Sequence, residues 1–111
     1  MAFYVYILAS RRNGTLYIGH TESLEVRMSQ HRQKLRHGFT AKYDVQNLIW
    51  FCLHDTREGA RARERQLKHW NRAWKIRLIE AFNPTWKDLY EDFLNGNACA
   101  FAGPLPERPT D

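Results

Sequence analysis

The 111-residue sequence has few cysteines, few prolines and no long apolar run. Its two cysteines, Cys52 and Cys99, stand in unrelated contexts, so neither a disulfide framework nor a cysteine-based zinc site is expected. No stretch approaches the roughly 20 apolar residues that a membrane-spanning helix needs, and the first residues do not resemble a signal peptide. These absences predict a soluble, unprocessed protein of the reducing cytoplasm, with no membrane partner.

Charge is distributed unevenly along the chain, whose formal net charge is +5. Residues 1–84 contain 15 Lys and Arg against 7 Asp and Glu, whereas residues 85–111 contain 2 against 5. A basic body favours a polyanionic partner, because each neutralised phosphate releases condensed counterions. Nucleic acid is the commonest such partner, but many basic proteins bind none, so charge alone does not establish it.

Hydrophobic periodicity predicts one small α+β domain over residues 1–94 and a flexible acidic tail with Pro and Gly over residues 95–111. The first expected elements are strands over 3–9 and 15–19 with turn residues 11–14 between them, and then a helix from Ser23 to about residue 36. A central strand over 47–53 follows. Three helices complete the domain: one from a cap at Asp55 to about residue 70, one from Asn71 to Asn83, and a last one, capped by Thr85 and Asp88, to about residue 94. Its β-β-α-β-α-α core predicts a small three-stranded, mainly antiparallel sheet flanked by helices.

The register of the first hairpin decides whether two tyrosines can meet. A four-residue loop would place Tyr6 opposite Gly19 and diagonal to Tyr17, about 7–8 Å away on the same face of the sheet. A two-residue turn would place Tyr6 opposite Thr21 and separate the two hydroxyl groups too far. A shared site therefore requires the wider loop, in which Gly19 leaves space beside Tyr6.

The ordered motifs over residues 3–90 resemble the GIY-YIG nuclease domain, and specifically its small single-domain (UPF0213-like) members. The residues that carry this resemblance are Val5-Tyr6-Ile7, Tyr17-Ile18-Gly19, Arg27, His31 and Glu64, together with the segments over 38–40 and 71–75 and with Tyr43. The first motif lacks the family's glycine. Asn71 lies only seven residues beyond Glu64, so the role of the family's distal asparagine is not assigned to it.

The resemblance implies a role for each of five catalytic residues. Glu64 would bind one Mg²⁺ or Mn²⁺, and Arg27 would contact the scissile phosphate. Tyr6 would act as general base, relayed through His31, while Tyr17 would position the water or the phosphate. The pKa of a free phenol is about 10, so the base role requires Arg27 and the metal to lower it.

Helical spacing is consistent with this site. Arg27 and His31 are four residues apart on one helix face, and Glu64 shares a stripe with Ala60 and Leu67. The five catalytic side chains are expected to meet around one pocket beside the paired strands. Basic and aromatic residues predicted to contact nucleic acid are Lys42, Tyr43, Arg61, Lys68, Arg72 and Lys75.

The sequence is therefore compatible with three functions. The first is a metal-dependent endonuclease that acts on duplex, branched or single-stranded DNA, structure-selective and linked to repair or recombination, without a small-molecule cofactor. The second is a catalytically inactive nucleic-acid-binding module. The third is a structural or interaction domain that binds no nucleic acid. Taken singly, the two tyrosines are typical of sheet packing and Glu64 of a surface ion pair, so only their joint spacing favours catalysis.

Overall fold

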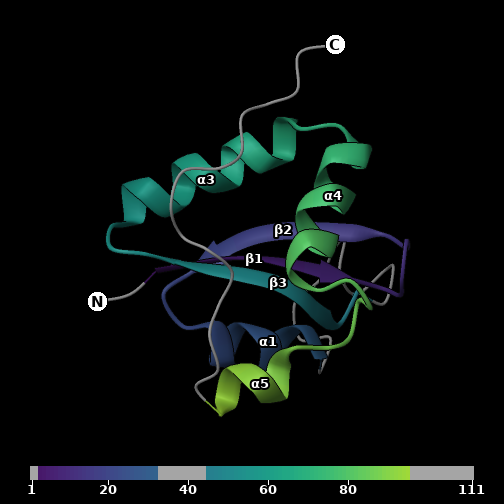
Figure 1. Ribbon diagram of the computed structural model, residues 1–111. Helices are drawn as coiled ribbons and strands as arrows, with labels where there is room; N and C mark the ends of the chain where they lie inside the picture. Colours follow the sequence, from purple (N-terminus) through teal and green to yellow (C-terminus); the bar gives the residue numbers. More distant parts are fainter. Residues whose placement is uncertain (1–2, 33–44, 96–111) are drawn as a thin grey trace.

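The structure, a computed structural model, describes residues 3–32 and 45–95 (Figure 1). Its elements are β1 (Phe3–Ala9), β2 (Leu16–Thr21), α1 (Leu24–Arg32), β3 (Asn47–His54), α3 (Arg57–His69), α4 (Arg72–Phe82) and α5 (Tyr90–Leu94). The predicted end of the first helix near residue 36 and the tail over 96–111 lie outside the described residues. None of the described helices is long and apolar enough to cross a membrane.

The three strands form an antiparallel sheet in the order β2-β1-β3, which confirms the predicted α+β class. One expectation was wrong: β3 is an edge strand of this sheet, and β1 is the central one. The apolar run of β3 instead reflects the helices that cover both of its faces. Continuous hydrophobicity reports burial of the side chains and not hydrogen bonding on both strand edges.

The first hairpin has the wider of the two loops considered. Tyr6 pairs with Gly19 and Leu8 with Tyr17, as a four-residue loop predicts. The Ser10 N–H donates to the Thr15 carbonyl at 3.1 Å, which closes the loop. Both tyrosine side chains therefore project from the same face of the sheet.

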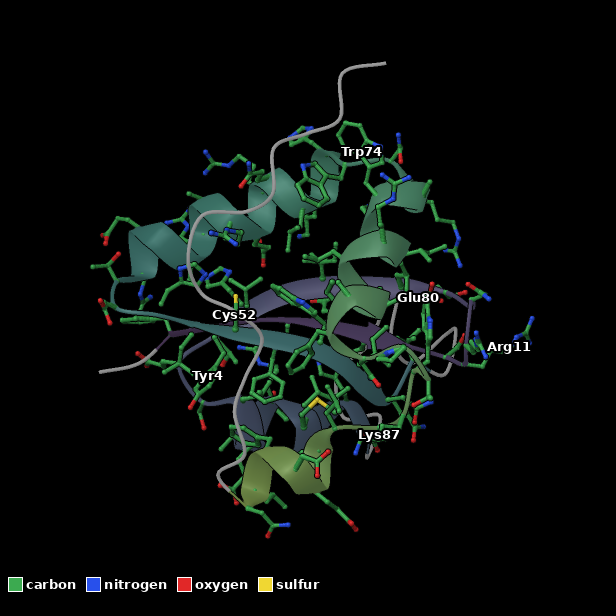
Figure 2. The ribbon with its side chains drawn as sticks, in the orientation of Figure 1. Tyr4, Arg11, Cys52, Trp74, Glu80 and Lys87 are labelled. Carbon is green, nitrogen blue, oxygen red and sulfur yellow. The ribbon has the colours of Figure 1, made fainter. Side chains whose placement is uncertain are left out.

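The helices cover the sheet on two sides. In Figure 1, α3 and α4 lie over one face, and α1 and α5 lie over the other. Residues that alternate along β1 are divided between two buried clusters, with Val5 and Ile7 on the α3 side and Tyr6 and Leu8 on the α1 side. In Figure 2, Cys52 of β3 points toward α3 and Tyr4 of β1 toward α1 and α5.

Caps explain where the helices after β3 begin. The cap of α3 is Thr56, whose hydroxyl accepts the Gly59 N–H at 3.0 Å, and not Asp55 as expected. A threonine oxygen three residues before a free N–H satisfies one of the unpaired donors of the first turn. The predicted cap at Asn71 is confirmed, since its side chain accepts the Trp74 N–H at 3.0 Å.

The last helix differs from the prediction that Thr85 and Asp88 cap it. α5 begins at Tyr90 and has no side-chain cap. Asp88 accepts the N–H groups of both Leu48 and Tyr90 at 3.1 Å, so its carboxylate joins the start of α5 to β3. A long-range hydrogen bond of this kind leaves no trace in local spacing.

Candidate functional site

A buried polar group lies between the sheet and α1. The Tyr6 hydroxyl is hydrogen-bonded to Nε2 of His31 at 3.3 Å, and the two side chains have exposed fractions of 0% and 2%. The Tyr17 ring lies 6.2 Å from the Tyr6 ring and 5.4 Å from the His31 ring, measured between centroids. Three of the five predicted catalytic side chains thus meet, and only Tyr17 among them is more than marginally exposed.

Gly19 is required by this group. A Cβ atom at this position would lie 2.6 Å from the hydroxyl oxygen of Tyr6 and 3.1 Å from Cε1 of Tyr17. Any side chain there would displace one or both phenols. The space that the motif predicts beside Tyr6 is therefore present, and the Tyr6 ring fills it.

Glu64 lies on the other side of the sheet, on the inward stripe of α3 with the fully buried Ala60 and Leu67. Its Oε1 atom accepts a hydrogen bond from Nδ1 of His20 at 2.9 Å, and its Oε2 atom lies 3.5 Å from Nζ of Lys68. The Glu64 side chain is 18% exposed. Because side chains alternate along β2, His20 faces α3 whereas Tyr17 faces α1, so the predicted site residues come from both faces.

Two pockets open along β2. One, of about 300 Å³, is lined by Leu16, Tyr17, Ile18, Lys68 and Lys75. The other, of about 170 Å³, is lined by Phe3, His20, Thr21, Glu22, Arg27 and Arg57. Each contains one of the residues that contact Glu64, namely Lys68 in the first and His20 in the second. The five predicted residues are therefore distributed around β2, and neither pocket is lined by all of them.

His20 is a site residue that the sequence reasoning missed. It directly follows Gly19 in β2, and its Nδ1 atom lies 2.9 Å from the Glu64 carboxylate. The signal was present in strand alternation: if Tyr17 faces one side, the residue three positions later faces the other. Pairing this position with a carboxylate on α3 required knowing which face α3 covers.

The predicted nucleic-acid contacts have different surroundings. Lys68 and Lys75 line the larger pocket, and Arg61 is exposed on α3. The guanidinium of Arg72 donates to the carbonyl oxygens of Asn13 and Gly14, each at 2.6 Å, so it holds the hairpin loop. Lys42 and Tyr43 lie outside the described residues.

Burial affects the charge of two groups near these surfaces. Burial, reinforced by the positive charge of Arg72, lowers the pKa of Lys75. Burial also lowers the pKa of His54, Arg63 lowers it further, and Asp55 opposes the shift. Nε2 of His54 lies 3.3 Å from Sγ of Cys52.

The donors suited to a metal ion are few. Within residues 3–32 and 45–95, no three His, Cys, Asp or Glu side chains are grouped so that they could hold a metal. Glu64 is an inward, partly exposed carboxylate whose neighbour Lys68 has a 54% exposed side chain that can move aside. This arrangement fits a hard divalent cation such as Mg²⁺, which is commonly held by one or two carboxylates, with water and phosphate oxygens as the other ligands.

Comparisons with known proteins agree with these motifs. A family model described as the GIY-YIG catalytic domain matches residues 2–77. The solution NMR structure of a UPF0213 protein from Bacillus halodurans aligns with a TM-score of 0.51 at 24% identity, covering 82% of this chain and 96% of that one. That likeness shows the fold. A comparison with curated proteins gives no match.

Proposed function

Because the chain belongs to the GIY-YIG family, which is of the nuclease type, we propose that it is a metal-dependent endonuclease that hydrolyses phosphodiester bonds in DNA along β2. The observation that supports this most directly is the position of Glu64. A carboxylate on the inward stripe of α3 contacts a histidine and a lysine, and each of these lines a pocket beside β2. Tyr17 also belongs to β2, and Arg27 lines the smaller pocket together with His20.

Hydrolysis of a phosphodiester requires positive groups beside the phosphate, a positioned water molecule and neutralisation of the leaving oxygen. Arg27 supplies a planar fork of N–H donors that suits two phosphate oxygens. We assign direct contact with the substrate to Tyr17, because it is partly exposed and lines a pocket. Tyr6 and His31 are buried behind it, so in this proposal they are positioning residues that orient the Tyr17 ring and hold a proton.

Glu64 would hold the divalent cation, Mg²⁺ or Mn²⁺. When bound, such a cation supplies positive charge that stabilises the negative charge developing on the phosphate in the transition state. His20 would fix the orientation of the Glu64 carboxylate, as partners of metal ligands commonly do. Lys68 would leave the carboxylate and become available to the substrate.

A second candidate function is a nucleic-acid-binding module without catalysis. The observation in its favour is that both Glu64 oxygens already have cationic or hydrogen-bonding neighbours in the protein. In that case Glu64 would stabilise the contact of α3 with β2, and its loss would leave nucleic-acid binding unchanged. We favour the nuclease, with repair or recombination as its setting, because the family's nuclease type and the motif residues agree.

The test is a cleavage panel of duplex, single-stranded and branched DNA with Mg²⁺ or Mn²⁺. We expect cleavage by the natural protein and none by Glu64→Ala, while Glu58→Ala, on the exposed first turn of the same helix, cleaves normally. Cleavage by Glu64→Ala at the natural rate would exclude this mechanism. Salt-sensitive binding without cleavage of any substrate would support the binding module instead.

A further inference from the structure

We propose that the outer edge of β2 holds a locally single-stranded segment of nucleic acid, with one nucleotide seated in the pocket lined by Leu16, Tyr17, Ile18, Lys68 and Lys75. This inference rests on the proposed function and names its substrate class. It predicts that duplex DNA reaches the site only where a base is unpaired, frayed or flipped out.

The first support is the backbone of β2. Ser10 and Thr15 form a hydrogen-bonded pair, so alternate residues from Thr15 onward direct their N–H and C=O groups toward β1. The backbone groups of Leu16, Ile18 and His20 therefore point to the other side. Within residues 3–32 and 45–95, no strand pairs with that edge.

These outward N–H groups suit an extended phosphate backbone. They recur every second residue, about 6.8 Å apart, along one straight edge. Backbone N–H groups commonly donate to phosphate oxygens in complexes with nucleic acid. The edge of β2 thus offers a row of N–H donors to a single nucleic-acid strand. A duplex lying along this edge would bring its second nucleic-acid strand against the helices on either side of the sheet.

The second support is the composition of the larger pocket. The side chains of Leu16 and Ile18, which alternate with Tyr17 along β2, belong to the face covered by α3 and α4 and give the pocket an apolar surface against which a base can lie. A volume of about 300 Å³ is suited to a single nucleotide rather than to a base pair within a duplex. A base in a duplex is stacked and must be extruded before it can enter such a pocket.

The third support is charge. Lys68 and Lys75 border the same pocket, and Nζ of Lys75 donates to the Lys68 carbonyl at 3.4 Å, which holds its ammonium group near α3. Burial and the neighbouring Arg72 disfavour the charged form of Lys75 and lower its pKa. A phosphate anion beside this ammonium group would offset that unfavourable environment.

The position of the larger pocket relative to Glu64 predicts the order in which a bound nucleic-acid strand would meet the two pockets. Lys68 lies at the larger pocket and contacts Glu64, which contacts His20 at the smaller pocket with Arg27. A strand along β2 would place the scissile phosphate toward Arg27 and the neighbouring nucleotide in the larger pocket. The smaller pocket also contains Arg57, whose guanidinium lies 5.6 Å from the centre of the Phe3 ring.

The inference is tested by binding without metal. A fluorescent thymidine oligonucleotide of about eight nucleotides is titrated with protein in a chelator, so that binding is measured without cleavage. Lys68→Ala and Lys75→Met remove the pocket lysines, and Lys87→Ala is the matched control. Lys87 is exposed and lies near α5, away from α3 (Figure 2).

We expect each pocket variant to weaken oligonucleotide binding about tenfold and Lys87→Ala to weaken it by no more than about twofold. Lys75→Met should be at least as thermally stable as the natural protein, because it replaces a partly buried ammonium group by an apolar side chain of similar length. A loss of binding in this variant would then not be caused by unfolding. Equal effects of all three variants would overturn the inference, since bulk charge would then explain binding. Equally tight binding of a blunt duplex of the same length would also overturn it.

A crosslinking experiment locates the base directly. An oligonucleotide with one 5-iodouracil is irradiated in complex with the protein, and the modified peptide is identified by mass spectrometry. We expect attachment within residues 16–18 of β2 or at Lys68 or Lys75; attachment only at residues remote from this pocket would contradict it. These results do not depend on catalysis, so a protein that binds as expected but never cleaves would refute the proposed function alone. A protein that cleaves while its pocket variants bind normally would refute this inference alone.

Discussion

The hydroxyl oxygen of Tyr6 occupies the space that a Cβ atom on Gly19 would need, at a distance of 2.6 Å. The motif Tyr17-Ile18-Gly19 therefore matters in two ways: it supplies the phenol of Tyr17, and its glycine has no side chain to collide with Tyr6. Because Gly19 lies directly opposite Tyr6 in the hairpin, the register of two strands fixes the place of the buried hydroxyl and of its partner His31.

Gly19→Ala tests this close approach. The added methyl group must displace the Tyr6 ring, and overpacking of this kind costs about 1–3 kcal/mol in the free energy of unfolding. Urea denaturation measures the loss. Gly59→Ala in α3 is the comparison: its Cβ would meet a single side-chain atom at 3.0 Å, the Thr56 hydroxyl that caps the helix, and no phenol ring, so a smaller loss is expected. Equal stability of Gly19→Ala and the natural protein would show that the phenol is not confined as described.

Tyr6→Phe and Tyr17→Phe should separate positioning from substrate contact. Tyr6→Phe removes the buried hydrogen bond to His31, so we expect a loss of about 1 kcal/mol in stability. Misplacement of the Tyr17 ring should then lower cleavage by up to about 100-fold. Tyr17→Phe should lower cleavage while thermal stability stays close to that of the natural protein. If Tyr6→Phe cleaves normally, the buried phenol has no part in the reaction.

Arg72→Ala should destabilise the protein through the hairpin. Two carbonyl groups of the β1–β2 loop lose their guanidinium donor, and we expect a cost of about 1 kcal/mol, measured by thermal or urea unfolding. Arg77→Ala removes an equal charge from the same helix at an exposed position and is the control. Were Arg72→Ala to weaken oligonucleotide binding far more than Arg77→Ala without affecting stability, Arg72 would bind substrate instead.

His54 should make the protein less stable in acid. Its pKa in the folded state is lowered from 6.5, chiefly by burial and next by Arg63, so the unfolded chain takes up a proton first as the pH falls. Stability is therefore unaffected by this group above about pH 6.5 and decreases as the pH falls from there through the lowered value. Melting temperatures at pH 7.5 and 5.5 should differ less in His54→Gln than in the natural protein.

The exposed His69 provides the comparison for this pH effect. His69→Gln should retain the natural difference between the two melting temperatures. If both variants retain it in full, a different group is responsible for the acid sensitivity.

Local patterns predicted much of the fold for identifiable reasons. The hairpin register followed from loop length and alternation, and the cap at Asn71 followed from its side-chain oxygen before an apolar stripe. The cap at Asp55 was wrong because the adjacent Thr56 also carries a capping oxygen, and spacing does not distinguish such neighbours. β3 was expected in the centre because hydrophobicity reports covered faces and not paired edges.

The candidate site was predictable only in part. Tyr6, Tyr17 and His31 meet because one hairpin and one helix packed on it determine their positions. The side of the sheet on which Glu64 lies depends on where the chain crosses after β3, which no local spacing encodes. For the same reason His20 was not recognised as its partner.

The dependence of cleavage on Glu64 tests the central claim most directly. Single-turnover rates on the best substrate are measured over a range of Mg²⁺ concentrations for the natural protein, Glu64→Gln and Glu58→Gln. We predict rates that rise with Mg²⁺ and saturate for the natural protein and Glu58→Gln, and background rates at every concentration for Glu64→Gln. Saturating cleavage by a folded Glu64→Gln protein at the natural rate would contradict the account.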